Sequence, residues 1–266
     1  KKYLDSCFTY IESLISKFKV SQIELHIDIN FSQHGEWKYN YLRDYGYIDS
    51  TINDSIFPLN DSRDNLFYRI NRSSRKLIKK TLKIENCNIN IYDKDNITTE
   101  VFYQYKKCHY ICAGRQTRSD KSFDYALELI KNGQGVLLEI TLNKEGIGYL
   151  VIFLLENKYV ILSSIANIPE YEIKIPIYRM LYWKAIQLFA NEYEVLYYGY
   201  PAGNSMVEGF KSYMDKKQLE IARYKKYMGG ITVPHYRGIR YMDRKLMLKD
   251  VNTFKEKIGE HYEDSI

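Results

Sequence analysis

Apolar residues recur along the chain in two patterns, one with the spacing of strands and one with the spacing of a helix. Three short runs rich in β-branched and aromatic residues, at 134–142, 147–156 and 159–165, have strand length and end at turn signals. The short turns between them predict an antiparallel meander. Residues 177–191 then place apolar side chains at helical spacing, and residues 195–200 predict a fourth strand.

Further predicted elements flank this meander on both sides. A short strand at 88–92 and helices at 99–113 and 119–132 precede it. After the fourth strand, residues 208–211 are expected to open a short helix, and residues 218–227 are expected to form a last strand. The order β-α-α-β-β-β-α-β-α-β predicts an α+β fold in which helices flank a mixed sheet.

The first sixty residues show a similar order of elements. A helix at 2–19 precedes a strand at 22–29, a short helix at 37–45 and a strand at 47–59. Helix, strand, short helix and strand also follow one another between 177 and 227, without residue identity. This weak repeat predicts a first domain that is incomplete in the given sequence, with residues 22–29 in a small sheet of their own.

Composition narrows the class of protein. With 266 residues, 45% of them hydrophobic, the chain can bury a large core. Lys and Arg number 39 and Asp and Glu 33, and the net charge of +6 is compatible with anionic partners such as nucleotides, phosphosugars or RNA. The four cysteines lack the spacing of a disulfide framework or a zinc site, so we expect no metal and a reducing, cytoplasmic setting. No apolar stretch has the length of a transmembrane segment.

The most basic segment, residues 61–85, is predicted to be one helix that links two domains. Its cations include Arg72, Arg75, Lys76 and Lys79, with almost no carboxylate among them. Clustered cations lower the energy of a polyanion, which indicates a phosphate-binding or RNA-binding surface. The alternative is a solvated helix that only joins the two domains.

A loop between two predicted helices contains a second group of candidate binding residues. Gly114 can end the first helix and Ser119 can cap the second, with Arg115, Gln116 and Arg118 between them. Arginine is suited to bidentate capture of phosphate or carboxylate. These three residues are therefore predicted to bind substrate.

Four features in this order carry a resemblance to a known family. They are the basic helix at 71–83, the aromatic-then-arginine segment at 102–116, the proline-led helix at 176–190 and the pair Phe210-Lys211. Together they resemble the FemAB-type peptidyltransferases and their GNAT-like relatives, which include the BioF2-like acetyltransferase group. The resemblance extends from about residue 2 to residue 228.

The resemblance implies two GNAT-like acyltransferase domains. The first domain would be incomplete at residues 1–60, and a basic linking helix would occupy residues 61–87. The second domain would extend over residues 88–229. The tail at 230–266, with a charged helix from 251 to about 260, would pack on the first domain.

The resemblance also implies an activity and the residues that perform it. Enzymes of this type transfer an aminoacyl group from aminoacyl-tRNA to an amine on a peptidoglycan precursor. The lysine of the Phe-Lys pair stabilises charge that develops on the reacting carbonyl or phosphate, a role that falls here on Lys211, with Phe210 shaping the site. Their positions in the expected fold add Tyr198, Tyr200 and Glu208 to the predicted substrate-binding residues.

The choice of acyl donor depends on whether the loop before the helix at 177–191 contains glycine. GNAT enzymes that use CoA hold its pyrophosphate on a glycine-containing loop at a helix N-terminus. The corresponding segment here, residues 166–176, contains no glycine. Aminoacyl-tRNA is therefore the expected donor, with acetyl-CoA as the alternative. Asp28, Glu139 and Glu208 are available as a general base, and the sequence singles out none of them.

Three functions stay open from the sequence alone. The first is transfer of an aminoacyl or acyl group onto an amine of a bacterial cell-envelope precursor, either peptidoglycan or a surface sugar, with tRNA and a peripheral membrane contact as expected partners. The second is CoA-dependent N-acetylation of a small molecule or a nucleotide sugar. The third is a non-catalytic RNA-binding protein or interaction scaffold.

Overall fold

The computed structural model describes residues 2–27, 39–156 and 158–263. The chain divides into two compact units. Unit 1 consists of Lys1–Asp54, Tyr200–Arg223 and Thr232–Ile266, and unit 2 consists of Ser55–Gly199 and Tyr224–Ile231. Among the helices of the described ranges, none is both long enough and apolar enough to cross a bilayer.

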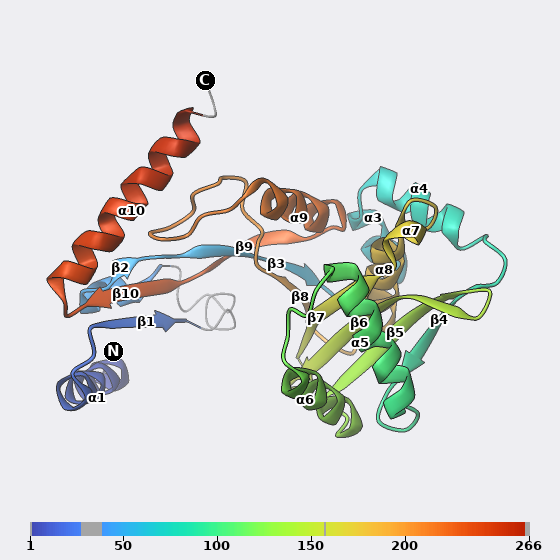
Figure 1. The fold of residues 1–266 in the computed structure, drawn as a ribbon, viewed down its shortest axis with the longest axis horizontal. Helices are drawn as coiled ribbons and strands as arrows, with labels where there is room; N and C mark the ends of the chain where they lie inside the picture. The colour runs from blue at the N-terminus through green and yellow to red at the C-terminus, as the bar shows by residue number, and fades with distance from the viewer. Residues whose placement is uncertain (1, 28–38, 157, 264–266) are drawn as a thin grey trace. The chain divides into compact units, whose positions relative to one another are not determined.

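Unit 2 is built on a mixed sheet (Figure 1). Its strands are β4 (Cys87–Tyr92), β5 (Gly135–Leu142), β6 (Glu145–Leu155), β7 (Tyr159–Asn167), β8 (Val195–Gly199) and β3 (Ile52–Pro58), which begins in unit 1. The strands lie in the order β4-β5-β6-β7-β8-β3, and β9 (Ile231–His235) follows β3. Strands β4 to β7 pair antiparallel, β8 pairs parallel with β7, and β3 pairs antiparallel with β8.

Helices cover both faces of this sheet. They are α3 (Arg63–Arg69), α4 (Arg72–Thr81), α5 (Thr99–Ala113), α6 (Asp120–Lys131), α7 (Pro169–Glu172) and α8 (Ile177–Phe189). The cross-strand pair Leu138 and Leu150 packs with α8, while Leu137 and Val151 pack on the opposite face with α5 and α6. Burial on both faces explains why these strands are nearly continuous apolar runs in the sequence.

The parallel pairing of β7 with β8 is short. It joins Tyr159 to Val195, Val160 to Leu196 and Ile161 to Tyr197, and extends no further. The rest of β7 continues to Asn167 alongside β6 only. Because the chain then passes through α7 into α8, the end of β7 and the first turn of α8 are brought together.

Unit 1 contains a second, three-stranded sheet. Its elements are α1 (Lys2–Phe18), β1 (Gln22–His26), the 3-10 helix η1 (Tyr41–Tyr45), β2 (Ile48–Asp49), β10 (Arg237–Tyr241) and α10 (Arg244–Glu263). Strand β10 lies between β1 and β2 and is antiparallel to both. Phe8, Leu42 and Tyr47 form part of its small core.

Most of the predicted elements are confirmed. The α+β class, the meander, α5, α6, α8 and β8 agree with the predictions within a few residues. The stretch at 22–26 lies in a small sheet of its own, as expected, whereas residues 28, 29, 37 and 38 of the predicted elements lie outside the described residues. The domain boundaries 1–60, 61–87, 88–229 and 230–266 stay a prediction.

The predicted last strand at 218–227 is wrong, because this segment is the helix α9 (Lys216–Tyr227). Asp215 and Gln218 form a reciprocal cap at its start. The Gln218 N–H donates to Asp215 Oδ1 at 2.7 Å, and the Asp215 N–H donates to Gln218 Oε1 at 2.9 Å. Two backbone donors are satisfied at once, which favours a helix over the strand that Leu219 and Ile221 suggested.

The prediction of one helix at 61–85 is also wrong. The segment forms α3 and α4, which are separated at Ile70 and Asn71. The Asn71 side chain accepts a hydrogen bond from the Ser73 N–H at 2.9 Å and so caps α4. Asparagine favours this capping geometry over a helix interior.

Two further predictions need correction. Residues 208–211 form a turn instead of opening a helix, and Lys211 has a positive φ of 63°. The tail contains β9 and β10, which the sequence analysis missed, and its helix α10 begins at Arg244 instead of 251. Both strands are short and gain their hydrogen bonds from distant parts of the chain, so local periodicity does not reveal them.

The two-sided burial of β6 can be tested with Leu150→Ala. Leu150 is 0% exposed, and its removal from a packed core is expected to lower the free energy of unfolding by about 2–5 kcal/mol. Leu155→Ala on the same strand, where the side chain is 43% exposed, is the matched control and should cost far less. Denaturant unfolding of both variants measures the difference, and equal losses would contradict a core centred on β6.

Candidate functional site

A cluster of buried polar side chains joins the end of β7 to the start of α8. Glu172 Oε2 accepts the backbone N–H of Ile177 at 3.1 Å and the side-chain N–H of Asn167 at 3.2 Å. Asn167 Oδ1 in turn accepts the Tyr178 hydroxyl at 3.0 Å and the Cys112 thiol at 3.3 Å. The chain's own carboxylate therefore occupies the N-terminus of α8.

Burial decides the protonation of this carboxylate. Burial raises the pKa of Glu172 to about 7, although the N–H groups of α8, the Arg179 guanidinium and Asn167 oppose the shift. Burial also raises the pKa of the Tyr178 hydroxyl. Glu172 accepts a backbone N–H at the first turn of α8, where the helix N-terminus stabilises negative charge. With a pKa of about 7, the same carboxyl can gain or lose a proton near neutral pH.

An arginine and a group of tyrosines lie beside this cluster. The Arg179 guanidinium lies 5.2 Å from the centre of the Tyr224 ring, and its Nε donates to Ser74 Oγ at 3.3 Å. Tyr182 stacks on Tyr198 with ring centres 5.2 Å apart. The Tyr224 hydroxyl is buried and has no hydrogen-bond partner within the described ranges.

The four predicted phosphate-binding cations lie together on one groove. The groove has a volume of about 380 Å³ and is lined by Phe67, Tyr68, Arg72, Arg75, Lys76 and Lys79. Arg75 lies over the Tyr68 ring at 4.8 Å and Lys79 over the Phe67 ring at 5.5 Å.

One guanidinium nitrogen in this groove has no hydrogen-bond partner among the described residues. Arg75 Nη1 is buried and makes no hydrogen bond to any residue that the structure describes. No carboxylate lines the groove. Stacked cations with an unpaired guanidinium nitrogen are suited to hold phosphate groups.

Lys211 lies in a separate polar network in unit 1. Its Nζ forms an ion pair with Asp250 Oδ2 at 2.5 Å, and the Tyr241 hydroxyl donates to the same oxygen at 2.6 Å. The hydrogen bond from Lys211, followed by the one from Tyr241, lowers the pKa of Asp250. The Phe210 ring packs beside Phe254 at 5.1 Å. The ammonium is thereby held in place with a third of the side chain exposed.

The remaining predicted site residues divide between the two units. In unit 2, Arg115 is exposed, Gln116 donates to Asp120 Oδ1 at 3.3 Å, and Arg118 donates to the Ser163 carbonyl at 3.4 Å. Their substrate-binding role stays a prediction.

The predicted tyrosines and Glu208 make internal contacts. Tyr198 is buried in unit 2, where its hydroxyl donates to the Met228 carbonyl at 3.1 Å. Glu208 in unit 1 accepts the Asn53 side-chain N–H at 2.9 Å, and burial raises the pKa of Tyr200. Burial and internal bonding give Tyr198 and Glu208 a structural role in the fold, and their substrate contacts stay predictions.

A histidine–aspartate pair in unit 1 was missed by the sequence analysis. His235 Nδ1 lies 2.8 Å from Asp54 Oδ2, and the Asp54 side chain is fully buried. A carboxylate on one ring nitrogen fixes the orientation of an imidazole and leaves the other nitrogen to exchange a proton. Asp54 and His235 are 181 residues apart, so no local pattern could have linked them. Within the described residues, no cluster of three or more His, Cys, Asp or Glu side chains could hold a metal.

Three solved structures share this fold at low sequence identity. FemX gives a TM-score of 0.66 over 93% of this chain and 79% of its own, with 12% identity. The C-terminal domain of a lysylphosphatidylglycerol synthetase from Agrobacterium fabrum gives 0.60 over 93% and 77%, with 10% identity. L-PGS from Bacillus licheniformis gives 0.53 over 80% and 68%, with 12% identity.

The sequence comparisons found no such likeness. No family model and no curated protein matches the sequence. The resemblance to FemAB-type and GNAT-like proteins is nevertheless confirmed at the level of the fold, through FemX and the two synthetase structures.

The buried carboxyl of Glu172 makes stability depend on pH. Its pKa is about 7 in the folded chain and near the ordinary 4.5 when unfolded, so the folded state binds more protons between these values. Stability due to this group therefore falls as pH rises from about 4.5 to 7. Glu172→Gln should gain stability over the native chain as pH rises through that window.

Thermal unfolding at about pH 5 and about pH 8 measures this gain. Glu170→Gln, an exposed change two residues away, is the control and should show no such trend. A difference between Glu172→Gln and the native chain that stays constant with pH would contradict a buried, protonated carboxyl.

Proposed function

We propose that this protein transfers an aminoacyl group from aminoacyl-tRNA to an amine of a cell-envelope precursor. The amine nitrogen attacks the ester carbonyl, a C–N bond forms, and the ester C–O bond breaks. The tRNA hydroxyl leaves with the proton that the amine gives up. Because charged tRNA is a cytoplasmic metabolite, the proposal places the reaction in the cytoplasm.

The choice of aminoacyl-tRNA over acyl-CoA rests on one observation, which is that Glu172 occupies the N-terminus of α8. A CoA pyrophosphate at this position would meet the Glu172 carboxylate, which already accepts the Ile177 N–H. Glu172 occupies this backbone donor in either protonation state, and its ionised form adds like-charge repulsion, so a pyrophosphate would lose a contact that it needs. The segment at 166–176 contains no glycine, which also argues against a pyrophosphate-binding loop. An acyl-CoA donor is therefore disfavoured.

The groove on α3 and α4 supports a polyanionic donor. Arg72, Arg75, Lys76 and Lys79 present four cations without a lining carboxylate, and Tyr68 and Phe67 add ring faces. Phosphate contacts of this kind supply affinity without sequence readout, while aromatic faces can stack on unpaired bases. We assign this groove to the tRNA backbone.

Lys211 is assigned the role that the resemblance implies. Its ammonium pairs with Asp250, whose carboxylate also accepts the Tyr241 hydroxyl, so the charge is positioned before substrate arrives. A fixed positive charge near a developing oxyanion lowers the barrier without reorganisation. The lysylphosphatidylglycerol synthetase among the similar folds has a name that describes aminoacyl transfer to an envelope component, which agrees with this class of acceptor.

Calorimetry of the full chain tests the donor. Aminoacyl-tRNA should bind at moderate salt, with affinity that falls steeply as salt rises, and acetyl-CoA should give no saturable heat. The double variant Arg75→Ala/Lys79→Ala should bind tRNA about tenfold or more weakly and with a shallower salt dependence. Lys121→Ala, an exposed cation on α6, is the matched control. Saturable acetyl-CoA binding would overturn the proposal, and tRNA binding without any transfer would favour a non-catalytic RNA-binding protein.

Lys211→Met tests the catalytic assignment. The label on aminoacyl-tRNA should appear in a peptidoglycan-precursor fraction with the native chain, and the variant should be slower by about 10²–10³-fold, the usual effect of losing one group that stabilises an oxyanion. Circular dichroism checks that the variant is folded. Lys217→Met, at an exposed position of α9, should retain full activity. Unchanged transfer by Lys211→Met would remove Lys211 from the mechanism.

A further inference from the structure

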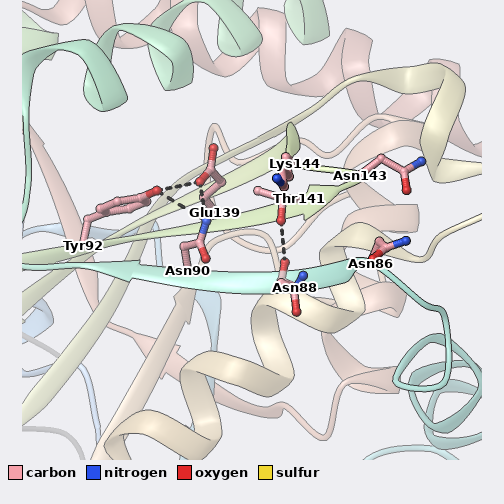
Figure 2. Close-up of a pocket in the computed structure, with 8 residues that line it drawn as sticks. All are labelled: Asn86, Asn88, Asn90, Tyr92, Glu139, Thr141, Asn143 and Lys144. Atoms are coloured by element: carbon pink, nitrogen blue, oxygen red, sulfur yellow. Dashed lines mark hydrogen bonds between the residues drawn. The ribbon is translucent and has the colours of Figure 1, made fainter.

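A second cavity lies on unit 2, on the strands β4 and β5 (Figure 2). Its volume is about 710 Å³, within the range of small-molecule sites. It is lined by Asn86, Asn88, Asn90, Tyr92, Glu139, Thr141, Asn143 and Lys144. Neither the resemblance nor the proposed acyl transfer assigns these residues a role as a group.

Strand geometry places these side chains on one face. Asn88 pairs with Thr141 and Asn90 with Glu139 across the two strands. Ile89 and Ile91 alternate with the asparagines and pack into the core on the other face. Polar side chains thus gather where β4 forms the edge of the sheet.

One end of the cavity is a preorganised network centred on Glu139. Its Oε2 accepts the Tyr92 hydroxyl at 2.8 Å and the Asn90 side-chain N–H at 2.9 Å, and its Oε1 accepts the Tyr149 hydroxyl at 2.9 Å. Burial and this carboxylate raise the pKa of Tyr92 to about 12. Figure 2 shows Tyr92, Asn90 and Glu139 joined by these bonds. The Tyr92 ring is therefore held in a fixed position.

The other end carries side chains with unused hydrogen-bonding capacity. The side chains of Asn86, Asn88, Asn143 and Lys144 form no hydrogen bond or ion pair with any residue that the structure describes. Each amide can donate two hydrogen bonds and accept two. Three such amides and one ammonium around one cavity leave many donors and acceptors for a ligand.

The composition of the cavity argues against three classes of ligand. Lys144 is the one cation in its lining and faces a site that also holds Glu139, so a polyphosphate or nucleic acid is unsuited. The carboxylate already accepts three hydrogen bonds, and the described residues contain no metal-binding cluster. With side-chain amides on half of the lining residues, an apolar ligand is unsuited as well.

We propose that this cavity binds a saccharide. Neighbouring hydroxyls of a sugar ring both donate and accept hydrogen bonds, which matches the side-chain amides of Asn86, Asn88 and Asn143. The Tyr92 ring offers a fixed flat surface for the apolar face of the sugar. This site rests on the cavity alone and does not depend on the proposed acyl transfer.

Ligand-detected NMR and calorimetry on the full chain test the proposal. The probes are maltose, cellobiose and N,N′-diacetylchitobiose, each titrated separately. At least one should bind with 1:1 stoichiometry, and Asn88→Ala should weaken it about tenfold or more, the loss of a good pair of hydrogen bonds. Asn88 is exposed on an edge strand, so the variant should fold. Tyr92→Phe, which keeps the ring but frees Glu139, should weaken it less.

Asn252→Ala, at an exposed position of α10, is the matched control and should bind as the native chain does. Failure of all three probes to bind would overturn the saccharide site. Binding that Asn88→Ala leaves unchanged would overturn it too, because the sugar would then lie elsewhere on the molecule.

Discussion

The parallel pairing of β7 with β8 ends after three residue pairs, and the candidate chemistry of unit 2 depends on that early end. Because β7 continues to Asn167 with only β6 beside it, its last side chains can meet the first turn of α8. The polar groups exposed at this point must find partners, and Glu172, Asn167 and Tyr178 satisfy one another.

The positions of charged side chains in unit 2 determine where this unit can bind an anion. The N-terminus of α8, a natural anion site, is filled by Glu172 from the same chain. Positive charge lies instead on α4, where Arg75 stacks on Tyr68 and its Nη1 has no hydrogen-bond partner among the described residues. An anionic ligand therefore gains more at α4 than at the helix end where a cofactor phosphate would bind.

The sequence predicted the helices and strands that are determined by interactions between residues close together in the chain. The meander, α5 and α8 follow from apolar periodicity, because burial on both faces or along one stripe leaves a strong pattern. Asp215 and Asn71 were misread, since a capping residue looks like any other polar residue until its N–H partners are known. The pairs Asp54–His235 and Lys211–Asp250 join distant segments, and only the tertiary fold brings them together. Lys211 was nevertheless chosen from the sequence, through the resemblance.

The positive φ of Lys211 has a consequence for substitution at this position. A side chain in the left-handed region costs roughly 1 kcal/mol relative to glycine, so the turn alone would favour glycine at this position. The ion pair with Asp250 offsets part of that cost. A change from lysine to glycine would relax the backbone at this turn, and it would also remove the positive charge that pairs with Asp250.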